Sequence, residues 1–222
     1  MKKRKYIEDS LFYRIFNFSY LALKLNVYFT ALNSALFLLC LFSSLRADTL
    51  IVFSLSFLTV GPSLLTFFKL FGEGDSNDIR FMEVLRTFKS VFIKGLRFSL
   101  IIGFLIVWFV ALLVFLLNQT HLLVLLPLFI TFGVISLSTV LLTMKLVSDS
   151  DVVSWKQTFH TSFQLSWQRL YISFIISIVV VALIYLMYYR AILGFLVLFS
   201  LGFTYVYHII NRIYFTLEET NK

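Results

Sequence analysis

The stretch that decides the fold is 59-TVGPSLLTFFKLFGEGDSNDIRFMEVLRTFKSVFIKGLRF-98. It begins with Thr-Val-Gly-Pro inside an apolar segment, passes through an acidic turn and a basic amphipathic segment, and enters a second apolar segment. Apolar residues make up 60% of the 222 residues and charged residues only 14%, whereas water-soluble domains have about half and about a quarter. The composition therefore predicts an integral membrane protein, and the rest of the chain repeats this plan.

Charge-free runs predict six membrane-spanning helices. Each run is close to the roughly 20 residues that cross the hydrocarbon core of a bilayer. Residues 98–144 form one long run that is interrupted only by the polar turn at 118–121, so this run supplies two spans. We therefore expect one all-α membrane domain over residues 1–222, with spans at about 25–45, 49–70, 98–118, 122–145, 170–189 and 191–211.

Lys and Arg residues gather on one side of this predicted topology. Of the 19, all but Arg46 and Arg190 lie before the first span, in the second or fourth connection, or after the last span. Cytoplasmic flanks of spans carry an excess of Lys and Arg, so both termini are predicted to be cytoplasmic. The net charge of +8 is then explained by contact with an anionic membrane surface, and nucleic acid is not an expected partner.

Amphipathic segments precede the first, third and fifth predicted spans, at 7–19, 78–97 and 152–170. A basic polar face combined with an aromatic apolar face is typical of a helix in the membrane interface. We expect three residues of segment 78–97, Arg80, Lys94 and Arg97, to contact headgroups or a protein partner. Its apolar stripe should be buried in lipid or against the bundle, and it consists of Phe81, Leu85, Phe88 and Phe92.

Sequence offsets indicate that this plan is used three times in parallel. Thr59-Val60-Gly61 and Thr131-Phe132-Gly133 are 72 residues apart, and Thr87-Phe88 and Thr158-Phe159 are 71 apart. Parallel repeats of an amphipathic helix and two spans are a known way to build membrane proteins. Chance is the alternative explanation, because 27 residues of the chain are Phe.

Gly61-Pro62 predicts a kink in the second span. Proline lacks a backbone donor, so a carbonyl one turn earlier loses its hydrogen bond. In a membrane, this carbonyl needs a partner from a neighbouring helix or a nearby hydroxyl. The nearby hydroxyls belong to Ser56, Thr59 and Ser63. A packing kink without a ligand is the favoured interpretation.

Patterns of catalytic or metal-binding residues are not recognisable. None of the eleven acidic residues lies at mid-span depth, which disfavours a proton relay. The three histidines, at 121, 160 and 208, lack the spacing of metal ligands. A Gly-rich phosphate loop and a nucleophile–base pair are also missing. Arg190 either ends two helices at the surface or is a buried cation. We therefore expect no enzyme activity and no cofactor.

Residues 59–95 resemble the YesL-like family of bacterial integral membrane proteins, whose biochemical function is undefined. The similarity extends to Leu25-Asn26 in the first span, but the family's proline at the end of that span is missing. Val84 stands where an aromatic residue is usual. The residues that carry the resemblance, and that form the predicted structural motif, are Thr59, Gly61, Pro62, Lys69, Phe88, Lys89, Phe92 and Gly95.

The resemblance implies an accessory subunit of a carbohydrate ABC importer, especially one for oligosaccharides, in the bacterial cell membrane. This association rests on the family's gene neighbourhood, and the implied partners are importer permease or ATPase subunits. The chain lacks the Glu-Ala-Ala-x-x-x-Gly loop of such permeases. A small independent carrier is the alternative, although Asn26, Asn33 and scattered hydroxyls offer few partners for a desolvated sugar.

Overall fold

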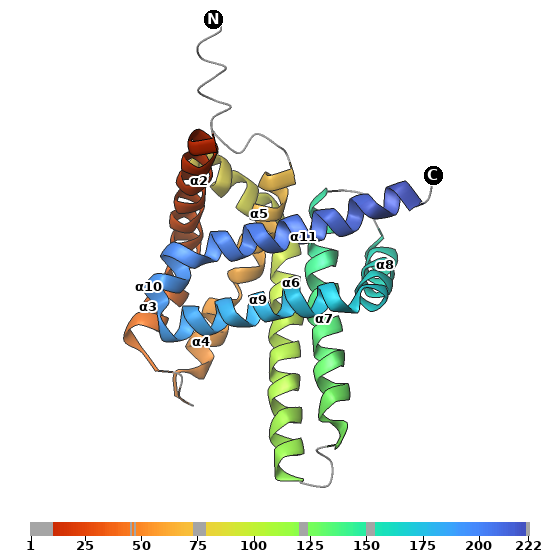
Figure 1. Cartoon of the computed structure of the whole chain (residues 1–222). Coiled ribbons are helices and arrows are strands. Elements are labelled where there is room, and N and C mark those ends of the chain that lie inside the picture. Colours follow the sequence, from red (N-terminus) through yellow and green to blue (C-terminus); the bar gives the residue numbers. More distant parts are fainter. Residues whose placement is uncertain are drawn as a thin grey trace, which may run out of the picture.

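The computed structural model describes residues 11–44, 46, 48–72, 79–119, 124–149 and 154–220. In these residues the chain forms helices and no strand (Figure 1). The order is α2 (Leu11–Leu32), α3 (Ser34–Phe42), α4 (Leu50–Phe57), α5 (Val60–Gly72), α6 (Phe81–Asn118), α7 (Leu126–Asp149), α8 (Trp155–Gln168), α9 (Leu170–Tyr189), α10 (Ala191–Leu193), the π-helix η3 (Gly194–Leu198) and α11 (Phe199–Thr220).

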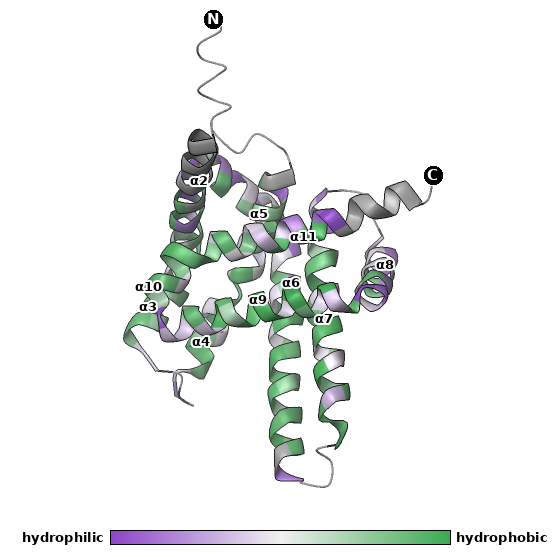
Figure 2. Cartoon of the chain, in the orientation of Figure 1, coloured by the Kyte–Doolittle hydropathy of each residue, from purple (hydrophilic) through white to green (hydrophobic). Residues whose placement is uncertain are grey.

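The described part of the chain contains five helical stretches that are long and apolar enough to cross a membrane. They are Leu50–Leu70, Phe81–Leu116, Leu126–Asp149, Leu170–Tyr189 and Ala191–Arg212. A bent helix pair, Leu23–Leu32 with Ser34–Phe42, makes a sixth if the pair is counted as one span. Figure 2 shows that apolar residues run along these helices. The predicted all-α, multi-pass fold is thereby confirmed.

The predicted first span, 25–45, is not a single helix. It bends by 87° between α2 and α3, at Asn33. The Asn33 side-chain amide donates to the Phe29 carbonyl at 3.0 Å, and the Asn33 backbone N–H donates to the same carbonyl at 3.0 Å. Asparagine weakens a helix because its side chain competes for backbone partners. Asn33 thus sets the place of the bend, which composition alone does not reveal.

Segment 78–97 is not a separate helix ahead of the third span. Both belong to α6, which continues for 38 residues and is therefore about 57 Å long at 1.5 Å per residue. A bilayer core is only about 30 Å thick, and spans rarely tilt beyond about 40°. One end of α6 must therefore leave the hydrocarbon, and the basic first turns are the end suited to do so. Segment 7–19 is likewise continuous with the first span from Leu11 onward, whereas residues 7–10 lie outside the described part.

The amphipathic helix before the fifth span is separate, unlike the other two. α8 ends at Gln168. Its C-cap, Arg169, has a φ of −118° and a ψ of 53°, which leave the helical region, and α9 starts at the residue after it. The Ser173 hydroxyl donates to the Ser166 carbonyl at 3.0 Å across this break. The predicted fifth span, 170–189, coincides with α9.

The core lies between α2, α5 and the last span. Phe29 stacks on Phe199 with ring centroids 3.4 Å apart, and Phe67 lies 5.9 Å from the same ring. Phe195 and Phe203 extend this aromatic cluster at either side. In Figure 1, α6 and α7 form a long antiparallel hairpin that extends beyond the other helices, and α9 and α11 run across it. The tip of this hairpin therefore has little cover from the rest of the chain.

Candidate functional site

The second predicted span is interrupted at Leu58–Thr59, between α4 and α5, and we call this interruption the proline break. Pro62 has no N–H to donate to the Leu58 carbonyl, as the sequence predicts. The Ser99 hydroxyl of α6 donates to that carbonyl at 2.8 Å, and it accepts the Gly61 N–H at 2.8 Å. One buried hydroxyl from a neighbouring helix therefore satisfies both backbone groups. The nearer hydroxyls of Ser56, Thr59 and Ser63 do not fill this role.

The proline break also brings two helix backbones into direct contact. A Cβ added to Gly61 would overlap the Gly95 carbonyl and the Ser99 hydroxyl, and one added to Gly95 would overlap the Pro62 backbone. Both glycines are buried. Small residues allow such close approach of membrane helices. Gly95, which is far from Gly61-Pro62 in the motif, thus forms one packing site with these two residues.

Asn33 connects the bend of the first span to the proline break. Its Nδ2 donates to the Ser63 hydroxyl at 2.9 Å, and its Oδ1 accepts from the Thr59 hydroxyl at 2.8 Å. The Ser63 hydroxyl donates to the Thr59 carbonyl at 2.8 Å, and the single proton of the Thr59 hydroxyl is shared between Asn33 and the Ser56 carbonyl at 2.9 Å. This cluster contains only neutral amide and hydroxyl groups, so it offers hydrogen bonds but no acid, base or strong nucleophile.

Asn26 performs a similar role at the last span. Its Nδ2 donates to the Val197 carbonyl at 3.0 Å, and its Oδ1 accepts the Ser200 N–H at 2.8 Å. Val197 is in η3 and Ser200 is the second residue of α11, next to the place where widening of the helix leaves backbone groups without their α-helical partners. Asn26 is buried. The hydroxyl of Thr30, one turn later in α2, donates to the Asn26 backbone carbonyl at 2.8 Å.

The other motif residues lie apart from this site. Lys69 is half-buried near the end of α5, and Lys89 is exposed on α6. Phe88 and Phe92 contact each other edge to face, with centroids 5.5 Å apart. The structure thus brings together the Thr59-to-Pro62 half of the motif with Gly95, and it leaves Phe88, Lys89 and Phe92 on another face of α6.

The face of α6 that packs on the bundle is not the predicted aromatic stripe. Phe81, Leu85 and Phe92 are 36% to 39% exposed, although Phe81 also contacts the Tyr28 ring. The packed residues are smaller or lie further along the helix: Val84, Val91, Gly95, Phe98, Ser99 and Ile102. The sequence predicts that the stripe is buried either in lipid or against the bundle. These exposures exclude the bundle as its main contact, and contact with lipid stays a prediction.

The three predicted contact residues of α6 have different surroundings. Arg80 is exposed at the N-cap of α6, and its backbone N–H donates to the Glu83 carboxylate at 3.1 Å. Lys94 is half-buried, and Arg97 is exposed over the Trp155 ring of α8 at 5.9 Å. Arg190 is also exposed, where it ends α9. Arg190 therefore belongs to the surface and not to a buried cation site.

Sequence reasoning missed a buried cation, Lys145 near the end of α7. Its Nζ donates to Asp149 at 2.7 Å and lies 4.6 Å from the centroid of the Tyr207 ring. The Lys145 side chain is only 8% exposed. The i,i+4 spacing of Lys145 and Asp149 is a signal in the sequence, but the contact with Tyr207 joins residues 62 positions apart.

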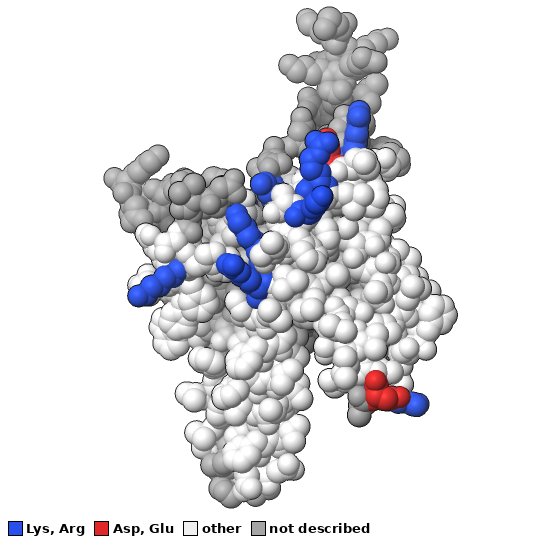
Figure 3. Space-filling view, turned by 180° about the vertical axis from the view of Figure 1, so that it is seen from behind, with Lys and Arg blue, Asp and Glu red and all other residues white. Residues whose placement is uncertain are grey.

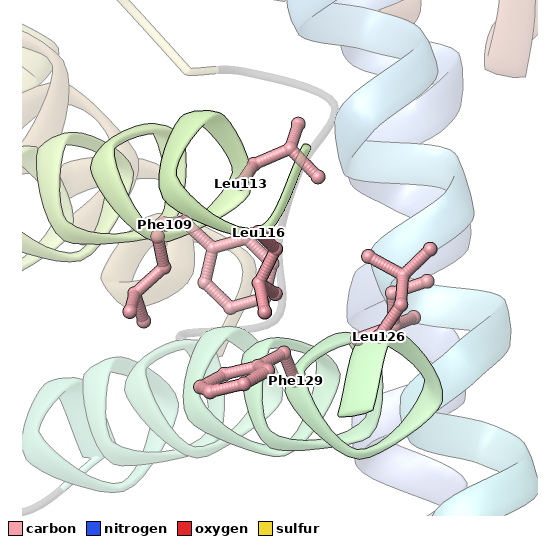
Figure 4. Close-up of a pocket in the computed structure, with 7 residues that line it drawn as sticks. Phe109, Leu113, Leu116, Leu126 and Phe129 are labelled. Atoms are coloured by element: carbon pink, nitrogen blue, oxygen red, sulfur yellow. The ribbon is translucent and has the colours of Figure 1, made fainter. Parts of the chain in front are cut away.

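Metal and small-molecule sites are not indicated by the remaining groups. Among the described residues, no group of three or more His, Cys, Asp or Glu side chains could hold a metal ion. His121 lies outside the described residues, and His160 and His208 are exposed. A small pocket lies between α6 and α7 near the hairpin turn, and Figure 4 shows its side chains projecting from both helices. All seven residues that line it are apolar, so it cannot recognise a sugar hydroxyl.

Comparisons with known proteins give no further assignment. No family model, curated protein or solved structure matches this chain.

Proposed function

We propose that this chain is a non-enzymatic membrane protein that acts as an accessory subunit of a carbohydrate ABC importer, in particular one for oligosaccharides. It resides in the bacterial cell membrane with both termini in the cytoplasm. Its partners are the permease or ATPase subunits of the importer. The apolar helices support the membrane location, and the resemblance of residues 59–95 supports the association.

The observation that carries the proposal is the use of the polar groups inside the spans. Asn26, Asn33 and Ser99 each bond backbone or hydroxyl groups of other helices. A carrier would need such groups for its substrate, because each desolvated sugar hydroxyl needs a partner. Here the same groups hold helix interruptions in place. A protein that works through its surfaces needs no polar path.

Exposed basic residues supply such a surface. Arg86, Lys89 and Arg97 are exposed along the first half of α6, and Figure 3 shows Lys and Arg side chains gathered over one part of the molecule. The projecting hairpin is without charge on the face seen there. This separation suits a protein with its hairpin in lipid and its basic side on the inner membrane surface.

Recovery of partners from the membrane tests the proposal. The tagged protein is purified in a mild detergent, and bound proteins are identified by mass spectrometry. We expect importer permease or ATPase subunits to be enriched over an unrelated six-span protein. Enrichment that is lost in the Arg86→Ala, Lys89→Ala double variant would place the contact on α6. Repeated absence of importer subunits would contradict the accessory role.

A small independent carrier is the second candidate, and one observation favours it. In the described residues, the spans are interrupted at Asn33, at the proline break and at η3. Many transporters bind substrates at discontinuous helices. Uptake of a labelled sugar by the purified protein in liposomes, compared with empty liposomes, separates the two candidates. Uptake without any partner would establish the carrier.

Cysteine labelling tests the orientation. In a Cys40→Ser background, the exposed Ser154 and Asp48 are each replaced by Cys. Because Lys and Arg concentrate around the connection that contains Ser154, Ser154→Cys should resist an impermeant thiol reagent in intact cells. Asp48→Cys should react. The reverse pattern would place the termini outside.

A further inference from the structure

α8 presents three different faces. The first face is buried, packs mainly on α7 and carries small polar residues together with one leucine: Thr158, Ser162, Leu165 and Ser166. The second is exposed and polar, with residues such as Gln157, His160 and Gln164. The third is exposed and aromatic. The sequence predicts only one apolar and one polar face, so the division into three comes from the structure.

The aromatic face consists of Phe159, Phe163 and Trp167, which are 49%, 42% and 61% exposed. They are four residues apart, so they follow one another along the helix surface. Trp155, four residues before Phe159 on the same helix, instead packs against Phe98 with ring centroids 5.1 Å apart. The helix therefore attaches to the bundle through Trp155 and its small residues, and it directs its other large rings away from the protein.

The direction of α8 relates this face to the bilayer. In Figure 1, α8 is seen close to end-on, whereas α7 runs along the page, so α8 lies across the helix on which it packs. α8 also runs across α9, so it is aligned with neither of the candidate spans that it joins, as is expected of a helix along the membrane surface. The next helix, α9, continues the apolar surface with Tyr171, Ile175 and Ile178, which are all exposed. The aromatic face is thus continuous with a surface that belongs in lipid.

We propose that the aromatic face of α8 binds the lipid bilayer at the boundary between headgroups and acyl chains. Phe159, Phe163 and Trp167 enter this boundary, while the polar face remains in contact with water and headgroups. Trp suits this depth because its ring is apolar and its indole N–H needs a polar partner. The small-residue face holds the helix close to α7. α8 is therefore a membrane-surface anchor that fixes how deep the fifth span sits.

Tryptophan fluorescence in liposomes tests this assignment. The chain has three Trp residues, so Trp108→Phe with Trp155→Phe leaves Trp167 as the single probe. Lipids that carry bromine near the headgroup end of their acyl chains should remove most of its emission, compared with unbrominated lipids. Iodide in the water should have a much smaller effect.

A matched probe on the polar face provides the control. It combines Trp108→Phe, Trp155→Phe and Trp167→Phe with Gln164→Trp, so it reports from the same turn of α8. Its emission should respond mainly to iodide. If Trp167 responds to iodide as strongly as this control and not to brominated lipid, the face lies in water and a protein partner is needed to cover it, which overturns the proposal.

A spin label gives the same information without a change of tryptophan. Phe163→Cys in a Cys40→Ser background carries the label on the aromatic face, and Gln164→Cys carries it on the polar face. We expect the Phe163→Cys label to collide more often with oxygen, which concentrates in lipid, than with a water-soluble nickel complex. The opposite order at this position would also overturn the proposal.

Discussion

The proline break and the π-helix η3 are two interruptions of membrane spans that are held in the same way but arise from different causes. At the proline break, the Ser99 hydroxyl donates to the Leu58 carbonyl and accepts the Gly61 N–H. At η3, the Asn26 amide donates to the Val197 carbonyl and accepts the Ser200 N–H. One interruption is forced by a covalent ring, and the other contains no residue that forbids an α-helix. The first should therefore persist without its partner, whereas the second should depend on it.

The largest effect is expected from filling the contact at the proline break. In Gly95→Leu, the new side chain would overlap the Pro62 backbone, which cannot move without shifting α5. Overpacking of this kind should cost more than about 3 kcal/mol. Folded protein in the membrane, measured as monodisperse material after detergent extraction, should fall strongly.

Gly103→Leu is the matched control for this substitution. Gly103 is on the same helix, and no atom lies within 4 Å of a Cβ added there. Its abundance should stay near that of the unchanged protein. Equal losses for the two variants would mean that α5 and α6 do not approach closely at Gly95.

The next effect is the loss of the hydroxyl at the proline break. Ser99→Ala leaves the Leu58 carbonyl and the Gly61 N–H without partners in a buried site, which should cost about 1–3 kcal/mol. The measurement is the free energy of unfolding in mixed micelles. Ser90→Ala on the exposed side of α6 removes a hydroxyl that bonds only the Thr87 carbonyl of its own helix, so it should have little effect.

A double-mutant cycle sharpens the role of Pro62. Pro62→Ala restores a backbone donor for the Leu58 carbonyl, so Ser99→Ala should cost less in that background than in the unchanged chain. The coupling energy should be about 1 kcal/mol. Additive effects of the two substitutions would show that Ser99 does not compensate for the proline.

A smaller effect is expected at η3. Asn26→Leu removes the hydrogen bonds to Val197 of the π-helix and to Ser200 just after it, but residues 194–198 can then relax to an α-helix and pair among themselves. The cost should be about 1 kcal/mol, below that of Ser99→Ala. Hydrogen exchange at the amides of 194–200 should change at the same time. A cost above that of Ser99→Ala would contradict the proposed difference between the two interruptions.

The smallest effect is expected from Asn33→Leu, in the same helix pair as Asn26. Asn33→Leu leaves the Thr59 and Ser63 hydroxyls with their acceptors on the Ser56 and Thr59 carbonyls. No buried donor loses its only partner, so the cost should stay below about 1 kcal/mol. Unfolding measured in the same micelles checks this order. If Asn33→Leu is more damaging than Asn26→Leu, the shared carbonyls do not satisfy the hydroxyls.

Local features of the fold were predictable from the sequence, and distant partners were not. Charge-free runs locate the spans because a bilayer excludes charge, and α9 begins and ends as predicted. Pro62 predicts an interruption because its ring acts on its own helix. Its partner Ser99 lies 41 residues from Leu58, and no pattern of spacing reports such a contact. The sequence therefore proposes only the hydroxyls nearest to the proline.

The two asparagines of the first span show the same limit. Their spacing places Asn26 and Asn33 on one side of a helix, but Asn26 bonds residues more than 170 positions away. η3 itself has no marker such as proline, since its sequence is Gly-Phe-Leu-Val-Leu. The candidate threefold repeat stays a prediction. Gly61 lies against the Gly95 backbone, whereas the space beside its counterpart Gly133 is filled by the Phe109 ring.

The unbroken length of α6 gives the molecule a mechanical property. Gly95, where α6 meets the proline break, is about 21 Å from the start of the helix and about 35 Å from its end at 1.5 Å per residue. Because α6 has no break, a force on its basic first turns rotates the whole helix about the contact between Gly95 and the proline break. We therefore expect a protein that binds the N-terminal end of α6 to move the hairpin tip by a larger distance than it moves that end. Distances between spin labels at the two ends would measure this difference.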